Sequence, residues 1–160
     1  MMEVLSNYEL YFKLILSAIL GFFIGWDRTS KNKPAGLKTY MYVAVSTTLI
    51  TIISIESVSM YSDLHPNVRV DPMRLAAQIV TGLGFLGAGV ILKDGLKVKG
   101  LTSAAMVFFV GAIGIGIGAG LYGPVVFTVF ITTIFSILGN YFKEHEIVPH
   151  KKSIEERKDE

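Results

Sequence analysis

The sequence predicts an all-α membrane protein, a bundle of five transmembrane helices with the N-terminus outside and the C-terminus in the cytoplasm. Three observations support this class: 51% of the 160 residues are hydrophobic, the mean hydropathy is +0.53, and long apolar stretches alternate with short polar segments. Both bulk values are high for a soluble protein of this size. The expected spans are about 9–26, 39–57, 74–92, 102–120 and 124–142.

The orientation follows from the positions of the positive charges. Twelve of the 15 Lys and Arg residues fall in the segments 27–38 and 93–101 and in the tail after residue 142. Positive residues are retained on the cytoplasmic side of a membrane, so these segments are expected to be cytoplasmic. Residues 1–142 then form one transmembrane domain, and the polar residues 143–160 form a disordered cytoplasmic tail.

The first two expected spans each carry a face suited to helix packing. Ser17, Gly21 and Gly25 recur at every fourth position of the first span, and small residues let membrane helices approach closely. No Lys or Arg precedes Lys13 and no small-residue cleavage site leads into a soluble domain, so this helix is expected to be retained rather than removed as a signal peptide. The second span gathers small and hydroxyl-bearing residues on one side: Tyr40, Ala44, Thr47, Thr48 and Thr51.

The third span combines spanning length with residues that a lipid-facing helix would not favour. Asp71 is a good N-cap and Pro72 a good first helical residue. Gln78 is a polar side chain within the span; a hydrogen bond to a neighbouring helix accounts for it, and a polar cavity is the alternative. Glycines on two faces predict a helix enclosed by protein on both sides, and these are Gly82, Gly84, Gly87 and Gly89.

Three of these glycines, Gly82, Gly84 and Gly87, also spell G-x-G-x-x-G, the pattern of dinucleotide-binding loops. That function needs a preceding strand, a soluble βαβ unit and an acidic residue about 20 positions later. The sequence has none of these features here. We therefore interpret the glycines as helix-packing residues.

The last two expected spans differ in character. The fourth carries Gly111, Gly114 and Gly118 on one stripe and Gly116 and Gly120 on another, which predicts two packing faces. The fifth is largely aromatic and β-branched, and it is expected at the lipid boundary or at an oligomer contact. Its one polar side is formed by Thr132, Ser136 and Asn140.

The two halves of the chain resemble each other weakly. Gly21 is followed by a basic loop and by Gly36 before a span, and Gly84 by a basic loop and Gly100, with separations of 15 and 16 residues. A duplication would relate the two helical hairpins by an axis along the membrane normal, as in parallel-repeat transporters. Independent use of Gly and Thr at helix ends would give a similar pattern.

Asp27 and Arg28, at the cytoplasmic end of the first span, are the first polar pair to single out. An ion pair or an interfacial anchor explains them structurally, and a carboxylate facing a cytoplasmic cavity is the functional alternative. Asp71 and Arg74 could pair across one helical turn at the outer end. The basic loops are most simply topology determinants and contacts to anionic lipids.

The sequence offers little for catalysis or metal binding. It has no cysteine, no nucleophile beside a base and no carboxylate near the middle of a span, so we expect no enzyme, no cofactor and no metal site. For the same reason a conduction path through one protomer is unfavourable. His145 and His150 in the tail lack the spacing of a recognised metal site. The net charge of +2 gives no reason to expect nucleic acid as a partner.

Three sequence blocks together resemble the signature of the MgtC/SapB family of membrane proteins. They are the stretch from Asp71 to Gly89, the block Pro34-Ala35-Gly36-Leu37-Lys38-Thr39, and the block Gly100-Leu101-Thr102-Ser103-Ala104-Ala105. The resemblance covers roughly residues 10–142. Further matching residues are Gly25, Asp27, Arg28, Gly114, Gly118, Gly120 and Tyr122.

The resemblance implies a bacterial plasma-membrane protein that is not an enzyme and serves adaptation to magnesium limitation or related stress. It would act by contacting other membrane proteins, with ATP synthase as one candidate, and a homodimer or higher homo-oligomer is expected. The alternative is a small transporter or channel for Mg²⁺ or another cation, formed by an oligomer. The functional polar residues are then Asp27, Arg28, Lys38, Asp71, Arg74 and Gln78, and the packing or signature residues are Gly21, Gly25, Pro34, Gly36, Thr39, Gly82, Gly84, Gly87, Gly89, Gly100, Thr102, Gly114 and Gly118.

Two departures from the family pattern limit what carries over. Members of the magnesium-response type have a soluble C-terminal domain, whereas this chain stops eighteen residues after Phe142, so no regulation through such a domain is expected. Tyr40 stands where the family pattern has His, so no titrating group is expected there. The chain is expected to fit the short, SapB-like branch, without a role in virulence.

Overall fold

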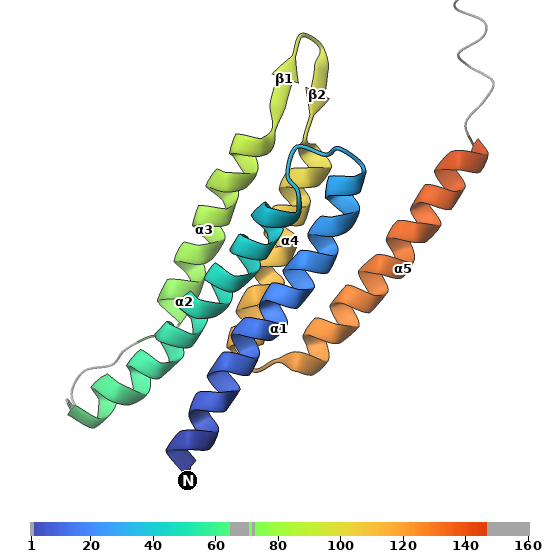
Figure 1. The fold of residues 1–160 in the computed structure, drawn as a ribbon. Coiled ribbons are helices and arrows are strands. Elements are labelled where there is room, and N and C mark those ends of the chain that lie inside the picture. The colour runs from blue at the N-terminus through green and yellow to red at the C-terminus, as the bar shows by residue number, and fades with distance from the viewer. Residues whose placement is uncertain (1, 65–70, 72, 147–160) are drawn as a thin grey trace, which may run out of the picture. The chain divides into compact units, whose positions relative to one another are not determined.

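The structure is a computed structural model and describes residues 2–64, 71 and 73–146 of the chain (Figure 1). Within these residues lie five helices: α1 (Met2–Ser30), α2 (Leu37–Leu64), α3 (Met73–Val90), α4 (Leu101–Gly118) and α5 (Tyr122–Glu146). Each includes a stretch of 18 to 23 residues that is apolar enough to cross a membrane. The predicted all-α class with five spanning helices is confirmed. The orientation in the membrane stays a prediction, and most of the expected tail lies outside the described residues.

The chain divides by its internal contacts into two units, residues 1–122 and 123–160, which are described separately here. The second unit contains α5 from Gly123 onward. Within α5 the Thr133 hydroxyl donates a hydrogen bond to the Val129 carbonyl oxygen at 2.7 Å, so a polar side chain is satisfied inside the helix itself. The first unit holds α1 to α4 and both candidate sites. The assignment of residues 1–142 to a single domain stays a prediction.

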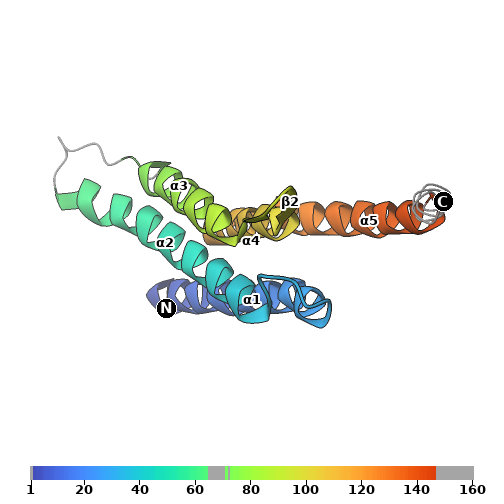
Figure 2. The same cartoon turned by 90° about the horizontal axis from the view of Figure 1, so that it is seen from above.

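The central helices of the first unit are α2 and α4. α1 packs mainly against α2, α3 packs mainly against α4, and α2 lies between α1 and α3 (Figure 2). The buried core lies around Tyr40 and Ala44 of α2 and Val107 and Val110 of α4. Because lipid is as apolar as these side chains, close packing rather than escape from water holds the helices together.

Glycines bring the helix backbones into direct contact in this core. A Cβ on Gly25 of α1 would lie 2.5 Å from the Leu37 Cα of α2, and a Cβ on Gly118 of α4 would lie 2.7 Å from the Thr51 Cβ of α2. No side chain larger than hydrogen fits at these distances. Gly21 of α1 and Gly114 of α4 lie against α2 in the same way, whereas Gly111 of α4 lies against Leu83 of α3.

Within the first unit, protein covers only one side of α3, so the expectation that protein encloses this helix on both sides stays a prediction. α3 buries one face, formed by Ile79, Leu83 and Gly87. No described atom lies within 4 Å of the position that a Cβ would take on the glycines of its other faces. Glycine marks a face available for close approach, but the sequence does not say whether the neighbour belongs to the same chain. The open positions are Gly82, Gly84 and Gly89.

A β-hairpin, which is not among the predicted elements, joins α3 to α4. Its strands β1 (Leu92–Asp94) and β2 (Lys97–Lys99) pair antiparallel, so α3 ends earlier than expected. The dipeptide Asp94-Gly95 was the available signal, since Asp-Gly favours tight hairpin turns, and Gly95 has φ 59°. Gly100 follows with φ 88°, and a Cβ there would run into the Val90 carbonyl oxygen, so this junction requires glycine.

Candidate functional site

Several residues that are distant in the sequence converge at one end of the first unit. We call it the hairpin end, because β1 and β2 lie there together with the C-terminus of α1, the loop 31–36 and the N-termini of α2 and α4 (Figure 1). Arg28 of α1, Tyr40 of α2 and Ser103 of α4 meet at this end. Residues from three helices and from two distant parts of the sequence therefore form one site in space.

These three residues form a polar link between three helices. The Arg28 Nη2 donates to the Ser103 Oγ at 3.5 Å, and the Tyr40 hydroxyl donates to the Ser103 carbonyl oxygen at 3.3 Å. Tyr40 and Ser103 are buried and Arg28 is half-buried. The Arg28 Nε is buried with no hydrogen-bond partner among the described residues. The link thus places a fixed positive charge beside the first turn of α4, where the helix dipole is also positive.

Asp27 does not take part in the link, and the Asp27–Arg28 ion pair that the sequence suggested is not formed. The Asp27 carboxylate lies 2.6 Å from the Lys31 Nζ, in an exposed pair one helical turn apart. Arg28 points instead toward Ser103. Neighbouring residues on a helix do not face each other, which explains the separation.

The loop 31–36 is held by a contact between the end of α1 and the start of α2. The Leu37 backbone N–H donates to the Thr29 Oγ1 at 2.7 Å, which caps α2 with a side chain from α1. A Cβ on Gly36 would lie 2.6 Å from the same oxygen, so glycine allows the loop to pass closely. Of the other residues in this block, Ala35 is buried, whereas Pro34, Lys38 and Thr39 are exposed.

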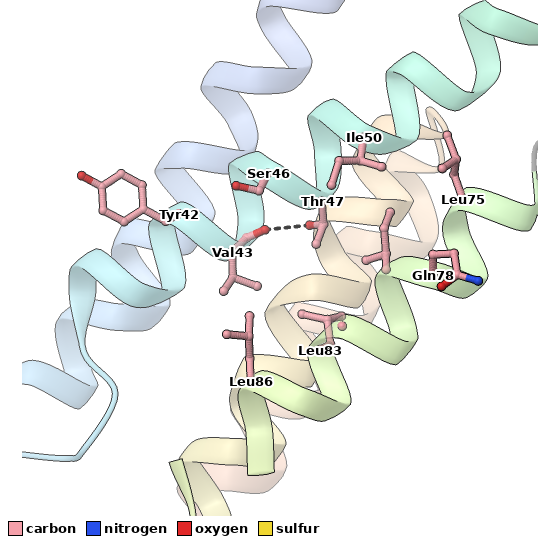
Figure 3. A pocket seen from close by; sticks show the side chains of 11 residues that line it. Tyr42, Val43, Ser46, Thr47, Ile50, Leu75, Gln78, Leu83 and Leu86 are labelled. Carbon is pink, nitrogen blue, oxygen red and sulfur yellow. Dashed lines mark hydrogen bonds between the residues drawn. The ribbon is translucent and has the colours of Figure 1, made fainter. Parts of the chain in front are cut away.

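A second candidate site is a groove of about 560 Å³ between α2 and α3, shown in Figure 3. The Thr47 hydroxyl in its wall donates to the carbonyl oxygens of its own helix, at 2.9 Å to Val43 and 3.1 Å to Ala44. Gln78 is exposed and forms no hydrogen bond with any described residue. The groove is therefore mostly apolar with one unpaired amide, and its lining residues are Tyr42, Val43, Ser46, Thr47, Ile50, Leu75, Gln78, Ile79, Gly82, Leu83 and Leu86.

The structure places Asp71 just before α3 and Arg74 and Gln78 in its first turns, so none of the three is brought to the hairpin end. The Asp71 Oδ1 accepts a hydrogen bond from the Met73 backbone N–H at 2.9 Å, as expected for an N-cap. Arg74 is exposed, and within the described residues it forms no ion pair with Asp71. The polar residues named from the sequence thus divide between two regions.

Lys13 is a charged residue within the first span to which the sequence assigned no role. Its side chain is 12% exposed inside the first spanning stretch and pairs with Glu9 at 3.0 Å. The Nζ lies 4.0 Å from the position of a Cβ on Gly120, just beyond the C-terminus of α4, where a helix dipole favours a cation. A Lys within an apolar span and a Glu four residues earlier were the available signals.

The chemistry of the two regions is that of binding surfaces. Among the residues that the structure describes, no three His, Cys, Asp or Glu side chains could together hold a metal ion. The hairpin end presents positive charge and hydrogen-bond donors, and the groove presents apolar surface beside the Gln78 amide.

Comparison with known proteins places the chain in a family. The model of the MgtC family matches residues 14–145, which includes the hairpin end, the groove and nearly all of the five spans. The chain belongs to the MgtC family. Together with the five apolar helices, this makes it a multi-pass protein of the bacterial plasma membrane.

Relatives in the MgtC family cover most of this chain. It is 46% identical over 124 residues to an uncharacterised protein of Haemophilus influenzae, which is 76% of this chain and 52% of the relative. It is 42% identical over 115 residues to protein SapB of Bacillus subtilis, with 71% and 49% covered. It is 41% identical over 121 residues to protein MgtC of Brucella abortus, with 75% and 47% covered. The chain therefore spans about half the length of these curated relatives, and no solved structure matches it.

In this MgtC-family chain, Arg28→Ala is expected to lower the free energy of unfolding by about 1–2 kcal/mol, because a charged hydrogen bond between α1 and α4 is lost. Lys31→Ala is the control, since it removes a neighbouring positive charge and only an exposed pair worth at most about 0.5 kcal/mol. Unfolding in detergent, followed by the fluorescence of the single tryptophan Trp26, measures both changes. Equal losses for the two variants would contradict the role of Arg28 as a link.

Proposed function

We propose that this MgtC-family protein acts in the bilayer by helix contacts with membrane proteins, including copies of itself, and that the α2–α3 groove is the contact surface. The family resemblance connects this action to adaptation under magnesium limitation or related stress. No catalytic step is part of the proposal. The membrane sector of a proton-driven ATP synthase is one candidate partner that the resemblance suggests.

The observation that carries the proposal is where the free space lies. Between α1, α2 and α4 the backbones touch through glycines, and the Thr48 hydroxyl of α2 donates across to the Gly114 carbonyl oxygen of α4 at 3.0 Å. These contacts pack α2 closely against both α1 and α4. The groove, in contrast, opens sideways between α2 and α3. A surface open toward the bilayer suits a contact with another membrane helix.

The polar residues at the groove support a protein occupant. Moving an amide from water into hydrocarbon without a hydrogen bond costs on the order of several kcal/mol. Lipid chains offer no such hydrogen bond. The Gln78 amide, with the exposed hydroxyl-bearing Ser46 across the groove, can pair with polar groups of a neighbouring helix. A helix therefore satisfies this surface better than lipid does.

The orientation proposed for the protein places the hairpin end in the cytoplasm. The exposed residues Lys31, Lys33, Lys38, Lys93 and Lys97 lie there, and positive residues are retained on the cytoplasmic side. Regulation from the cytoplasm would then act on the region of Arg28 and Ser103, and helix contacts would occur within the membrane.

A second candidate function is transport of Mg²⁺ or another cation through an interface between copies. It is favoured by the same Gln78 amide and the Tyr42 and Ser46 hydroxyls, which would face such an interface. Uptake into proteoliposomes, followed with Mg²⁺ and H⁺ probes, separates the two functions. Saturable flux that Gln78→Ala and Asp27→Asn both abolish would establish transport, and absence of flux from folded protein supports action by contact.

Filling the groove from within is expected to remove function. Ile50→Trp places a large side chain in the groove, whereas Ile55→Trp makes the same change on an exposed part of α2 that does not line it. Each variant is expressed in a strain that lacks the wild-type protein, and the cells are starved of magnesium. Cells that carry Ile50→Trp should grow like cells without the protein, and cells that carry Ile55→Trp should grow like cells with the wild-type protein. Both variants must be present in membranes at wild-type levels. Full growth with Ile50→Trp would remove the groove as the contact surface.

A further inference from the structure

Arg28 carries a positive charge that the described part of the chain does not balance. No described residue forms an ion pair with Arg28. Its contacts at the hairpin end are to neutral groups: the Nη2 donates to the Ser103 Oγ at 3.5 Å, which is long for a hydrogen bond, and the Tyr40 hydroxyl lies beside the guanidinium. The Arg28 Nε is buried without a hydrogen-bond partner among the described residues. The guanidinium therefore keeps N–H donors and a full charge for which these residues offer no anion.

The surroundings of Arg28 are positive as well. The first turn of α4 carries the positive end of the helix dipole, and its N-cap, Gly100, makes no side-chain capping bond. Asp27, the carboxylate next to Arg28 in the sequence, is held by Lys31 at 2.6 Å in an exposed pair. Exposed lysines of the loop 31–36 and of the hairpin add further positive charge at this end. An anion from outside the chain would be attracted by all of these groups together.

The depth of Arg28 in the bilayer indicates which anion is available. Arg28 lies near the end of the first spanning stretch, Tyr8–Ser30, and only two residues, roughly 3 Å along the helix, from Trp26. Trp26 is 60% exposed, and tryptophan side chains gather where the hydrocarbon meets the lipid headgroups. Arg28 is half-buried, so part of its side chain is accessible at that depth. Lipid phosphate groups are the anions at this level of a bilayer.

A phosphate group also has the geometry that Arg28 binds best. The guanidinium is a planar fork whose parallel N–H donors fit two oxygens of one phosphate. The contacts of Arg28 with Ser103 and Tyr40 hold this fork between three helices, so little side-chain freedom is lost when a ligand binds. The exposed lysines differ from Arg28, because a flexible ammonium group attracts an anionic lipid without fixing its position.

From these observations we propose that the hairpin end holds a single binding site for the phosphate group of a phospholipid. Arg28 binds the phosphate, and Ser103 and Tyr40 position Arg28. The site goes beyond the proposed contact role of the α2–α3 groove and does not depend on it. It also differs from a general attraction of the basic loops to anionic lipids, because retention of one lipid depends on one side chain. A soluble phosphate compound has the same chemistry, and the experiment separates the two sources.

Native mass spectrometry of the full chain, purified in detergent and titrated with phosphatidylglycerol, tests the site. The wild-type protein should retain one lipid, and Arg28→Gln should weaken this binding roughly tenfold or more, because hydrogen bonds to a charged group are lost. Lys33→Gln is the control, since it removes the same charge from an exposed side chain of the adjacent loop. It should weaken binding about twofold at most, because salt screens an exposed charge. Equal weakening by both variants, or by neither, would overturn the site.

Two further variants separate binding by Arg28 from its role in linking the helices. Ser103→Ala removes the hydroxyl that Arg28 contacts but keeps the guanidinium, so it should weaken lipid binding less than Arg28→Gln does. Arg28→Lys keeps the charge without the planar fork, so it should weaken binding more than Ser103→Ala does, and this comparison holds even where Arg28→Gln fails to fold. Losses as large in Ser103→Ala as in both Arg28 variants would mean that Arg28 acts only through the helix link.

Glycerol phosphate and inorganic phosphate test the source of the phosphate group, because they lack acyl chains. In protein freed of lipid, phosphatidylglycerol should raise the midpoint of thermal unfolding for the wild type and not for Arg28→Gln. Neither soluble compound should raise the midpoint at the same concentration. A rise as large with a soluble compound as with the lipid, lost in Arg28→Gln, would overturn the lipid as the source. Growth of Ile50→Trp cells in low magnesium is independent of these results, so failure of this site and failure of the groove are distinguishable.

Discussion

Gly114→Ala is expected to prevent the packing of α2 against α4 and thereby abolish the folded first unit. The added Cβ would occupy the position of the Thr47 Oγ1 and lie 2.6 Å from the Ala44 carbonyl oxygen. A side chain can change rotamer, but the carbonyl belongs to the helix backbone, so the helices must separate. Overpacking with some freedom to relax costs about 1–3 kcal/mol, and we expect more than about 3 kcal/mol here.

Size-exclusion chromatography and unfolding in detergent measure this effect, with Gly84→Ala as the matched control. Gly84 receives the same carbon atom on another helix, where nothing lies within 4 Å, so its variant should remain as stable as wild type. In the double variant Gly114→Ala/Thr47→Ala the overlap with the hydroxyl is relieved but the contact with Ala44 persists, and partial recovery is expected. A folded Gly114→Ala protein with wild-type stability would show that α2 and α4 do not pack as closely as described.

Tyr40→Ala is expected to cost about 3–5 kcal/mol, the range for removing a large aromatic side chain from a packed core. Tyr40 is fully buried at the junction of α1, α2 and α4, and its hydroxyl holds the Ser103 carbonyl oxygen at the start of α4. The lost packing would leave a cavity, and the lost hydrogen bond would loosen the Arg28 site at the same time.

Tyr42→Ala provides the control for this prediction, because the same side chain two residues later is 64% exposed. Its loss should change the unfolding free energy little. Tyr40→Phe should cost about 1 kcal/mol, which isolates the hydroxyl from the ring. The three variants are compared by the same unfolding experiment, and similar stabilities of Tyr40→Ala and Tyr42→Ala would contradict the burial of Tyr40 in the core.

Several features of the candidate sites are not evident from the amino-acid sequence. Asp27 is the neighbour that the sequence suggests for Arg28, yet the partner of Arg28 is Ser103, which is 75 residues away in the sequence. Such a pairing depends on which helices lie side by side, and helix order in space is not encoded in the hydropathy of any one span. The groove also depends on the arrangement of helices in space, because α2 and α3 form its walls and it exists only where they are separated.

The sequence by itself determines features that depend on neighbouring residues, namely the spanning helices and the packing face of α1. Span length and hydropathy fixed the five helices, because a backbone in lipid must satisfy its hydrogen bonds within the helix. The positions of Ser17, Gly21 and Gly25 determined the packing face of α1. Only the tertiary structure decided which glycines are in contact within the chain. Gly114 lies against α2, whereas Gly82 and Gly84 face no protein in the first unit. A glycine has no side chain whose chemistry would indicate its neighbour, and lipid and protein neighbours are equally apolar.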